Sequence, residues 1–268
     1  MAAKLVLVGG GTMGSALLEG LLEAGTLQAG EVIVVEPAAD RREAATDRFP
    51  GVTAVSALEL DQVDEGTSAI LAVKPDQAEG ALRATGAAGV RRVLSVVAGL
   101  STQRLENVLP EGAVVVRAMP NTPSLVGAGV SAISGGSHAT ASDLAWAEEL
   151  LGSVGVVVRV AERHQDAVTG VSGSGPAYLF MIAEALIDAG VAAGLPHGVA
   201  RTLVVETMLG SAKLMAETGE DPATLRAQVT SPGGTTAAGL RALEARAVRS
   251  AMLEAVMSAV ERSRNLGR

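Results

Sequence analysis

Hydrophobic and polar positions follow two different patterns along this chain, and the change comes near residue 160. Before it, short apolar runs end at glycine, proline or acidic residues and alternate with stretches whose apolar side chains recur every three or four positions. The short runs predict buried strands, and the longer stretches predict amphipathic helices. Strands are expected at Lys4–Val8, Glu31–Val35, Val52–Val55, Thr67–Val73, Arg92–Val97, Ala113–Met119 and Gly155–Val160, and helices at Thr12–Ala24, Ala39–Phe49, Pro75–Thr85, Ser101–Leu109 and Ala141–Leu151.

Alternation of strands and helices favours a parallel sheet with helices on both faces. We therefore expect residues 1–160 to form an α/β Rossmann-type domain with a mostly parallel sheet. In such a sheet, ligands bind beyond the carboxyl ends of the strands, so the residues that follow each strand carry most of the functional information.

Beyond about Ala161 the strand pattern ends. Helices are expected at Arg163–Val171, Gly175–Ala193, His197–Thr218, Pro222–Thr230, Gly234–Arg246 and Ala247–Leu266. Residues 161–268 are thus expected to form an all-α domain of ordinary size. Its helices are apolar over wide arcs, as Leu179, Met181 and Leu186 illustrate, which favours burial against a second copy of the chain. Burial against the sheet domain of the same chain is the alternative.

The first predicted strand runs directly into a glycine turn, Gly9 to Gly14 (GGGTMG), and a helix follows. Strand, glycine turn and helix together are the context in which the spacing G-x-G-x-x-G predicts a dinucleotide site. Gly9 allows the tight turn, Gly11 admits a pyrophosphate close to the backbone, and Gly14 lets the helix pack on the strand. The N–H groups at the helix N-terminus then face the phosphates. An ordinary turn in a glycine-rich chain is the alternative, and the second strand, ending in Glu36, disfavours it.

Glu36 bears on the choice of dinucleotide. An acidic residue at the end of the second strand accepts a hydrogen bond from the adenosine ribose and favours NAD. Arg41 and Arg42 follow within a few residues and are suited to the 2′-phosphate of NADP instead. The sequence leaves these two readings open, and it also leaves open that both arginines lie on a solvated helix face.

Residues at the ends of other strands complete the expected crevice. Lys74 follows the fourth strand, and Pro75 begins the next helix at a position where its missing N–H costs nothing. Val97 and Ala98 end the fifth strand with small side chains that let a flat ring lie against the backbone. Asn121, after the sixth strand, either binds a ligand carboxamide or caps its own turn, and we expect the ligand role.

Composition narrows the possible functions. The formal net charge of -8 disfavours nucleic acid and anionic membranes as partners, because both attract positive surfaces. The chain has no cysteine and its three histidines lack metal-ligand spacing, so we expect no disulfide, cysteine nucleophile or metal site. The N-terminal apolar run is too short for a signal peptide, and charges such as Glu184 and Asp188 interrupt later apolar stretches. A soluble cytoplasmic protein is expected.

Two segments of the helical domain contain more glycine than a packed helix favours. The first, Asp166 to Tyr178, holds several glycines and a proline. Glycine costs about 1 kcal/mol relative to alanine inside a helix, so its repeated use indicates a break or a close backbone approach. The second, Ser231 to Thr236 (SPGGTT), precedes a predicted helix and offers a second set of N-terminal N–H groups to an anion. A simple helix cap is the alternative, but beside a coenzyme site we favour a substrate carboxylate.

Four segments together resemble pyrroline-5-carboxylate reductases. They are Leu71 to Pro75 (LAVKP), Met119 to Pro123 (MPNTP), Asp166 to Tyr178 and Ser231 to Thr236, and they span both expected domains. The resemblance implies reduction of the cyclic imine 1-pyrroline-5-carboxylate to L-proline with NADPH or NADH, the last step of proline biosynthesis. It also implies a homodimer formed through interlocked helical domains, with dimers grouped into a decamer.

The resemblance further implies roles for individual residues. The expected coenzyme-binding residues are Val8, Gly9, Gly10, Gly11, Thr12, Met13, Ala72, Val73, Lys74, Pro75, Val96, Val97 and Ala98. Gly14, Glu36 and Asn121, discussed above, complete this set. The expected substrate-binding residues are Glu162, Ser231, Gly233, Gly234, Thr235 and Thr236. Thr236 is expected to act in catalysis by donating a hydrogen bond to the ring nitrogen, while orientation supplies most of the rate. Glu36 departs from the small or hydroxylated residues frequent in this family, although the resemblance as a whole favours NADPH.

Two other functions suit the same architecture. A β-hydroxyacid dehydrogenase calls for a lysine in the first helix of the helical domain, and Asp166 to Tyr178 contains none. A non-catalytic NAD(P)-sensing protein would keep the dinucleotide turn, but it has no need of a second anion-binding turn at Gly233 to Thr236.

Overall fold

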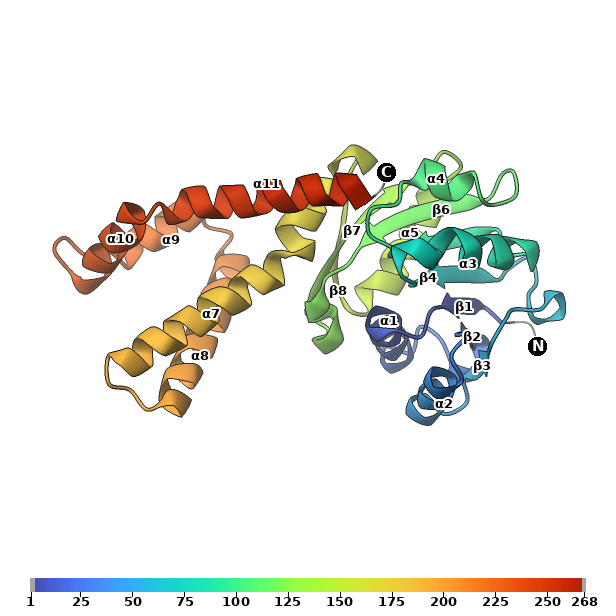
Figure 1. Ribbon diagram of the computed structural model, residues 1–268, viewed down its shortest axis with the longest axis horizontal. Helices are drawn as coiled ribbons and strands as arrows, with labels where there is room; N and C mark the ends of the chain where they lie inside the picture. The colour runs from blue at the N-terminus through green and yellow to red at the C-terminus, as the bar shows by residue number, and fades with distance from the viewer. Residues whose placement is uncertain (1–2, 267–268) are drawn as a thin grey trace. The chain divides into compact units, whose positions relative to one another are not determined.

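The computed structural model describes residues 3–266. The chain forms two compact units: Met1–Ser174 with Met257–Arg268, called the sheet unit here, and Gly175–Val256, called the helical unit. The strands of the sheet unit are β1 Leu5–Val8, β2 Val32–Val35, β3 Thr53–Val55, β4 Ser68–Leu71, β5 Arg92–Ser95, β6 Val114–Met119, β7 Gly129–Gly135 and β8 Gly155–Arg159. They form one sheet in the order β3-β2-β1-β4-β5-β6-β7-β8 (Figure 1).

The sheet is mostly parallel, which confirms the expected fold class. Pairing is parallel from β3 through β6, whereas β7 runs antiparallel to β6 and parallel to β8. The sequence pattern did not predict β7, because glycine stands at both of its ends and the buried Ser131 and Ser134 interrupt its apolar run. Inside the sheet the Ser134 hydroxyl donates a hydrogen bond to the Val160 carbonyl at 3.0 Å, so its burial leaves no unpaired donor.

Helices cover both faces of the sheet (Figure 1). Alternate residues of a strand point to opposite faces. Leu5 and Leu7 of β1 therefore pack into one core with α1 (Thr12–Glu23), α2 (Ala39–Arg48) and α5 (Ala141–Gly152). Val6 and Val8 pack into the other with α3 (Pro75–Ala87) and α4 (Thr102–Glu106). All five helices lie where the apolar spacing predicted them, although α4 is shorter at both ends than expected.

Two contacts tie α5 to neighbouring strands. Trp146, the one tryptophan of the chain, packs against the core of its face, and the guanidinium carbon of Arg92 in β5 lies 4.5 Å from the centre of its ring. This is a cation–π contact. Two residues further on, Glu148 pairs with Arg159 of β8 through two hydrogen bonds of 2.5 and 2.6 Å.

The glycine-rich segment after β8 is a distorted helix. A 3-10 turn at Glu162–His164 leads into α6 (Gln165–Val168) and then into a π-helical turn at Thr169–Gly173. A Cβ added at Gly173 would come within 2.6 Å of the Met119 Cε atom, which shows how closely this turn approaches the end of β6. The expectation of a break or a close backbone approach is confirmed in both respects.

The helical unit contains α7 (Gly175–Ala192), α8 (His197–Thr218), α9 (Pro222–Gln228), α10 (Thr235–Ala245) and the first part of α11 (Val248–Leu266), up to Val256. α7 and α8 lie side by side (Figure 1) and approach closely where Gly190 faces Ala200, since a Cβ on the glycine would be 3.0 Å from the alanine Cβ. Of residues 175–256, which are all described, Pro176 and Ala200 are the buried ones. The helical unit thus has no core of its own.

Large apolar side chains of the helical unit are exposed instead. Phe180 is 67% exposed, Leu209 62% and Leu253 64%. The stretch Glu162–Ala192 is also long and apolar enough, by length and composition alone, to cross a membrane. These two criteria are met equally by a helix whose apolar face another protein chain covers.

Candidate functional site

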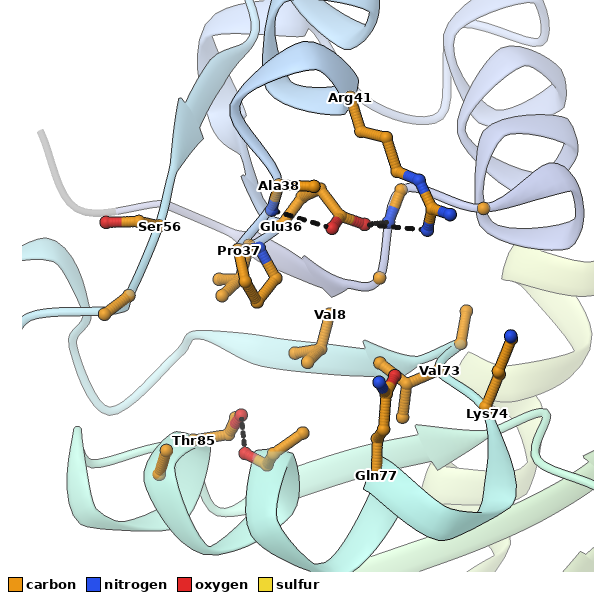
Figure 2. Close-up of a pocket in the computed structure, with 18 of the residues that line it drawn as sticks. Val8, Glu36, Pro37, Ala38, Arg41, Ser56, Val73, Lys74, Gln77 and Thr85 are labelled. Carbon is orange, nitrogen blue, oxygen red and sulfur yellow. Dashed lines mark hydrogen bonds and ion pairs between the residues drawn. The ribbon is translucent and has the colours of Figure 1, made fainter.

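A cavity of about 1120 Å³ lies beyond the carboxyl ends of β1, β2 and β4. Strand order reverses at β1, so the cavity occupies the switch point at which open α/β sheets bind ligands. Figure 2 shows most of its lining. The lining residues are Val8, Gly9, Gly10, Gly11, Thr12, Val35, Glu36, Pro37, Ala38, Arg41, Ser56, Ala57, Leu58, Ala72, Val73, Lys74, Gln77, Ala81, Ala84 and Thr85.

The three motif glycines differ in what surrounds them. Gly9 has a φ of +105° and a Cβ there would come within 2.6 Å of the Ala72 carbonyl oxygen, so the tight turn requires glycine. A Cβ at Gly14 would strike the Gly9 carbonyl, so Gly14 permits α1 to pack at the turn. A Cβ at Gly11 would meet nothing within 4 Å, and no side chain caps α1 at this residue. The turn thus leaves open space and free N–H groups beside Gly11, which suit a pyrophosphate.

Glu36 closes the site on the β2 side. Its side chain is buried, and its two carboxylate oxygens accept hydrogen bonds from the Gly10 N–H at 3.2 Å and the Ala38 N–H at 3.1 Å. The carboxylate therefore links the glycine turn to the loop that follows β2. Sequence reasoning gave Glu36 a ligand to bind and did not foresee this backbone role.

The second glycine turn lies in the helical unit. Gly233 has a φ of +71°, the Gly234 N–H donates to the Ser231 carbonyl at 3.1 Å, and Gly234 is the N-cap of α10. The first N–H groups of any helix have no acceptor within the helix itself, and in α10 no side chain caps them either. Ser231, Thr235 and Thr236 are exposed. The predicted turn at a helix N-terminus is therefore present.

Known proteins resemble the chain over its whole length. The pyrroline-5-carboxylate reductase of a Synechocystis species is 44% identical over 270 residues, which cover 100% of both chains. That of Mycobacterium tuberculosis is 41% identical and covers 98% of this chain and 97% of its own. The chain belongs to the pyrroline-5-carboxylate reductase family. Residues 162–266 match the family model described as pyrroline-5-carboxylate reductase dimerisation, and residues 4–99 match that described as NADP oxidoreductase, coenzyme F420-dependent.

Solved structures agree with this family membership. The pyrroline-5-carboxylate reductase of Coxiella burnetii superposes with a TM-score of 0.89 at 31% identity and covers 100% of both chains. The pyrroline carboxylate reductase of Plasmodium falciparum, solved with NADP bound, superposes with a TM-score of 0.87 at 29% identity, covering 99% of this chain and 98% of its own. The two-unit architecture is thus that of pyrroline-5-carboxylate reductases.

The cavity brings together many of the residues expected to bind the coenzyme. Those that line it are Val8, Gly9, Gly10, Gly11, Thr12, Glu36, Ala72, Val73 and Lys74. Those outside its lining are Met13, Gly14, Pro75, Val96, Val97, Ala98 and Asn121. Of the second group, Gly14 and Val97 serve packing, since Val97 is buried in the core beneath α3 and α4, while Pro75 is the first residue of α3. A direct coenzyme contact for these residues stays a prediction.

Asn121 has a structural partner. Its side-chain oxygen accepts a hydrogen bond from the Val130 N–H at 2.9 Å, which fixes the start of β7 against the turn after β6. The oxygen is therefore engaged by the backbone, and the expected ligand role would fall to the amide nitrogen.

Glu162 lies at a different cavity of the reductase. This cavity measures about 630 Å³ and is lined by α4, the loop between α4 and β6, the end of β7 with the loop that follows it, and Glu162 itself. The carboxylate accepts hydrogen bonds from the Thr102 N–H at 2.5 Å and the Thr102 hydroxyl at 2.6 Å, and Arg117 lies 3.4 Å away. Within the sheet unit Glu162 thus holds the start of α4, and a substrate contact for it stays a prediction.

Sequence reasoning missed part of the cavity wall. Ser56, Ala57 and Leu58 directly follow β3, so the rule of strand carboxyl ends was sufficient to find them. Gln77, Ala81, Ala84 and Thr85 form one face of α3, and their spacing of three and four residues was the signal. Among residues 3–266, no group of three or more histidine, aspartate or glutamate side chains is placed to hold a metal ion.

Proposed function

We propose that the protein reduces 1-pyrroline-5-carboxylate to L-proline with NADPH as the hydride donor. The observation that carries the proposal is full-length membership of the pyrroline-5-carboxylate reductase family, at 44% identity with complete coverage of both chains. The protein is then an oxidoreductase acting on a C=N bond.

The glycine turn fits the coenzyme. The open space at Gly11 admits a pyrophosphate to the N-terminal N–H groups of α1, and Lys74 at the cavity edge adds a positive charge. NADP is the bound dinucleotide of the Plasmodium relative, and the description of the model matched by residues 4–99 names NADP, so NADPH is the preferred donor. When bound, it supplies the hydride that the imine carbon accepts.

The turn at Ser231 to Thr236 would hold the substrate. The uncapped N–H groups at the start of α10 are suited to the carboxylate, and the helix dipole favours a negative charge there. The exposed Thr236 hydroxyl would donate a hydrogen bond to the ring nitrogen, and Ser231 and Thr235 add further donors.

The proton comes to the ring nitrogen and the hydride to the carbon, so the C=N double bond becomes a C–N single bond. A cyclic imine is basic enough to take its proton from solvent, so no strong acid is needed among the side chains. The residues around the two glycine turns would act mainly by holding coenzyme and substrate in a reactive orientation.

A homodimer is the proposed assembly, with dimers grouped into a decamer. Self-association is supported by the dimerisation model matched by residues 162–266 and by the exposed apolar side chains of a unit that has no core. We assign the apolar stretch Glu162–Ala192 to this contact instead of to a membrane. Functionally, residues 1–160 would bind the dinucleotide, residues 161–268 would bind substrate and partner, and the enzyme would be cytoplasmic.

The two rival functions have less support. Curated relatives that cover nearly all of the chain are named pyrroline-5-carboxylate reductase. A β-hydroxyacid dehydrogenase would need a lysine that the segment from Asp166 to Tyr178 lacks. An NAD(P) sensor would not need the uncapped turn before α10.

One assay tests the proposal. The purified protein is incubated with NADPH or NADH and 1-pyrroline-5-carboxylate, loss of the reduced coenzyme is followed by absorbance, and L-proline is identified by mass spectrometry. We expect proline to form in a one-to-one ratio with oxidised coenzyme. Coenzyme binding without any proline would refute the reductase and favour the sensor.

A further inference from the structure

Glu162 links the start of α4 to β6 inside the sheet unit. Its Oε1 atom accepts a hydrogen bond from the Thr102 N–H at 2.5 Å, and its Oε2 atom accepts one from the Thr102 hydroxyl at 2.6 Å. The Nη1 atom of Arg117 in β6 lies 3.4 Å from Oε1. Both carboxylate oxygens are thus engaged, and their partners stand 60 and 45 positions earlier in the chain.

The segment that carries Glu162 is itself firmly held. The Ser134 hydroxyl in β7 donates to the Val160 carbonyl at 3.0 Å and accepts a hydrogen bond from the Gln165 side chain at 2.8 Å. These two partners of Ser134 flank Glu162 in the sequence, and Gln165 is fully buried. Arg117 is buried as well, and Glu162 is the acidic side chain paired with it among the residues that the structure describes. A buried guanidinium needs a negative partner, so this pair fixes the place of the carboxylate.

The loop between β5 and α4, residues 96–101, lies where the nicotinamide half of the coenzyme is expected. The adenosine half of a dinucleotide lies at the end of β2, and the pyrophosphate lies at the glycine turn after β1. The other half then extends over β4 and β5, the next two strands of the sheet. The Val96 N–H donates to the Leu71 carbonyl at 3.0 Å, which anchors the start of the loop to the sheet. Glu162 anchors its end at Thr102.

We propose that Glu162 is a positioning residue for hydride transfer, because it holds Thr102 and with it the loop against which the nicotinamide lies. The inference rests on the proposed function. Hydride transfer requires the donor and acceptor carbons to meet at a defined distance, and a displacement of about 1 Å can slow a reaction roughly a hundredfold. A loop fixed at both ends keeps the nicotinamide ring in place. This role requires no contact between Glu162 and the substrate.

Fluorescence of bound NADPH tests how firmly the ring is held, without relying on turnover. The wild type is compared with Glu162→Ala, Thr102→Val and Thr102→Ser, after thermal unfolding has shown each variant to be folded. Glu162→Ala removes both hydrogen bonds to Thr102, Thr102→Val removes one of them, and Thr102→Ser keeps both. NADPH affinity should change by no more than about threefold, because the pyrophosphate turn is intact. The emission lifetime of the dihydronicotinamide should shorten in Glu162→Ala and Thr102→Val and stay near that of the wild type in Thr102→Ser.

The kinetics of 1-pyrroline-5-carboxylate reduction should follow the same order. In single turnovers, hydride transfer should slow roughly ten- to hundredfold in Glu162→Ala and by a smaller factor in Thr102→Val, while the steady-state KM for the imine acid stays within about threefold of the wild type. Thr102→Ser should transfer the hydride at nearly the wild-type rate. A raised KM with an unchanged transfer rate would assign Glu162 to substrate binding and overturn the inference. If Glu162→Ala does not fold, the comparison of Thr102→Val with Thr102→Ser carries the test.

Glu106→Ala is the matched control. Glu106 lies at the same cavity as Glu162 and accepts the N–H and the hydroxyl of Ser137 at 2.6 and 3.0 Å, so it makes the same pair of hydrogen bonds to the loop after β7. Its removal should lower the melting temperature and leave the NADPH lifetime and the transfer rate unchanged. The inference is overturned if Glu106→Ala shortens the lifetime as far as Glu162→Ala does, or if Glu162→Ala leaves lifetime and rate at wild-type values.

Failure of this inference and failure of the proposed function give different results. Proline formation by the wild type with no effect of Glu162→Ala refutes only the positioning role. A shortened NADPH lifetime in Glu162→Ala, in a protein whose wild type forms no proline, refutes only the reductase.

Discussion

Gly11 and Gly14 stand in one turn, but their surroundings predict opposite effects of a side chain. Gly11 has an ordinary φ of -74° and open space around it, so Gly11→Val should fold and fill the space that the pyrophosphate needs. We expect its melting temperature to stay near that of the wild type and NADP⁺ binding to fall below detection by calorimetry. A folded Gly11→Val that binds NADP⁺ with unchanged affinity would show that the turn is not the pyrophosphate site.

Gly14→Ala is the control for this experiment. Its new methyl group would strike a backbone carbonyl, which cannot move as a flexible side chain can. We expect about 1–3 kcal/mol of lost stability, the usual cost of overpacking, and a lower melting temperature without coenzyme. The pair therefore separates loss of binding from loss of packing.

Thr236 carries the substrate side of the proposal. Thr236→Ala should leave NADP⁺ affinity unchanged and lower kcat/KM for 1-pyrroline-5-carboxylate. The fall should correspond to a loss of roughly 1.5–3 kcal/mol of transition-state stabilisation, the range for a hydrogen bond to a charged group. Thr236→Ser keeps the hydroxyl and should recover much of this loss. If the methyl group matters through packing, Ser would be no better than Ala and both would melt earlier. Full activity of Thr236→Ala would remove the hydroxyl from the mechanism.

At the level of residues, the sequence predicted which residues stand at the coenzyme cavity better than it predicted the hydrogen bonds that their side chains make. The glycine motif was enough to predict the roles in packing and turn geometry that Gly9 and Gly14 have in the structure. It could not show that Glu36 faces two backbone N–H groups, or that Arg42 is bound to two carbonyls while Arg41 faces the cavity. Such choices depend on which rotamer a three-dimensional neighbourhood allows, and one sequence does not encode that neighbourhood locally.

Among the elements, the pair formed by Glu148 of α5 and Arg159 of β8 predicts a pH dependence. The hydrogen bonds from Arg159 hold the pKa of the Glu148 carboxyl below its usual value of 4.5. A carboxyl with a depressed pKa stabilises the fold above its unfolded pKa, and this contribution is lost as pH falls through the folded pKa.

Glu148→Gln tests that dependence. At pH 7 the variant should melt slightly below the wild type, by a small amount because the pair is exposed. The difference should shrink as the pH is lowered below about 4.5 and vanish once Glu148 is protonated in the folded protein. A difference that persisted unchanged at low pH would mean that the amide disturbs packing instead of removing a charge.

Strands and helices were predicted well in segments where the apolar residues follow a single spacing. α8 begins and ends at the residues expected, His197 and Thr218, because a long apolar repeat ends at Gly219. β7 was missed because its burial depends on its place between β6 and β8, which makes polar residues such as Ser131 acceptable. The π-helical turn at Thr169–Gly173 was expected only as a break, since glycine content does not reveal which hydrogen-bond pattern replaces the regular helix.

For the whole molecule, the exposed apolar side chains of the helical unit predict a test of self-association. Phe180→Glu places a charge on this surface, and burying an unpaired charge is costly. We expect the variant to elute with the mass of one chain when light scattering follows gel filtration, whereas the wild type elutes with at least twice that mass. The dissociation constant should rise at least about a hundredfold.

Leu60→Glu is the matched control, since Leu60 is equally exposed at 71% but lies in the sheet unit. It should leave the assembly unchanged. If both variants dissociate, added charge alone is responsible, and if neither does, the surface around Phe180 does not lie in the interface.

The placement of Trp146 has a practical consequence for following the two units separately. It is the sole tryptophan and lies in α5 under Arg92, while the sole tyrosine, Tyr178, lies in α7. Excitation at a wavelength that tryptophan alone absorbs should therefore report only on the sheet unit. Circular dichroism, to which helices of both units contribute, reports on the whole chain. Diluting the protein under mild urea should change the dichroism first while tryptophan emission stays native. The natural sequence thus already carries a fluorescent reporter for the unit in which we propose the coenzyme binds.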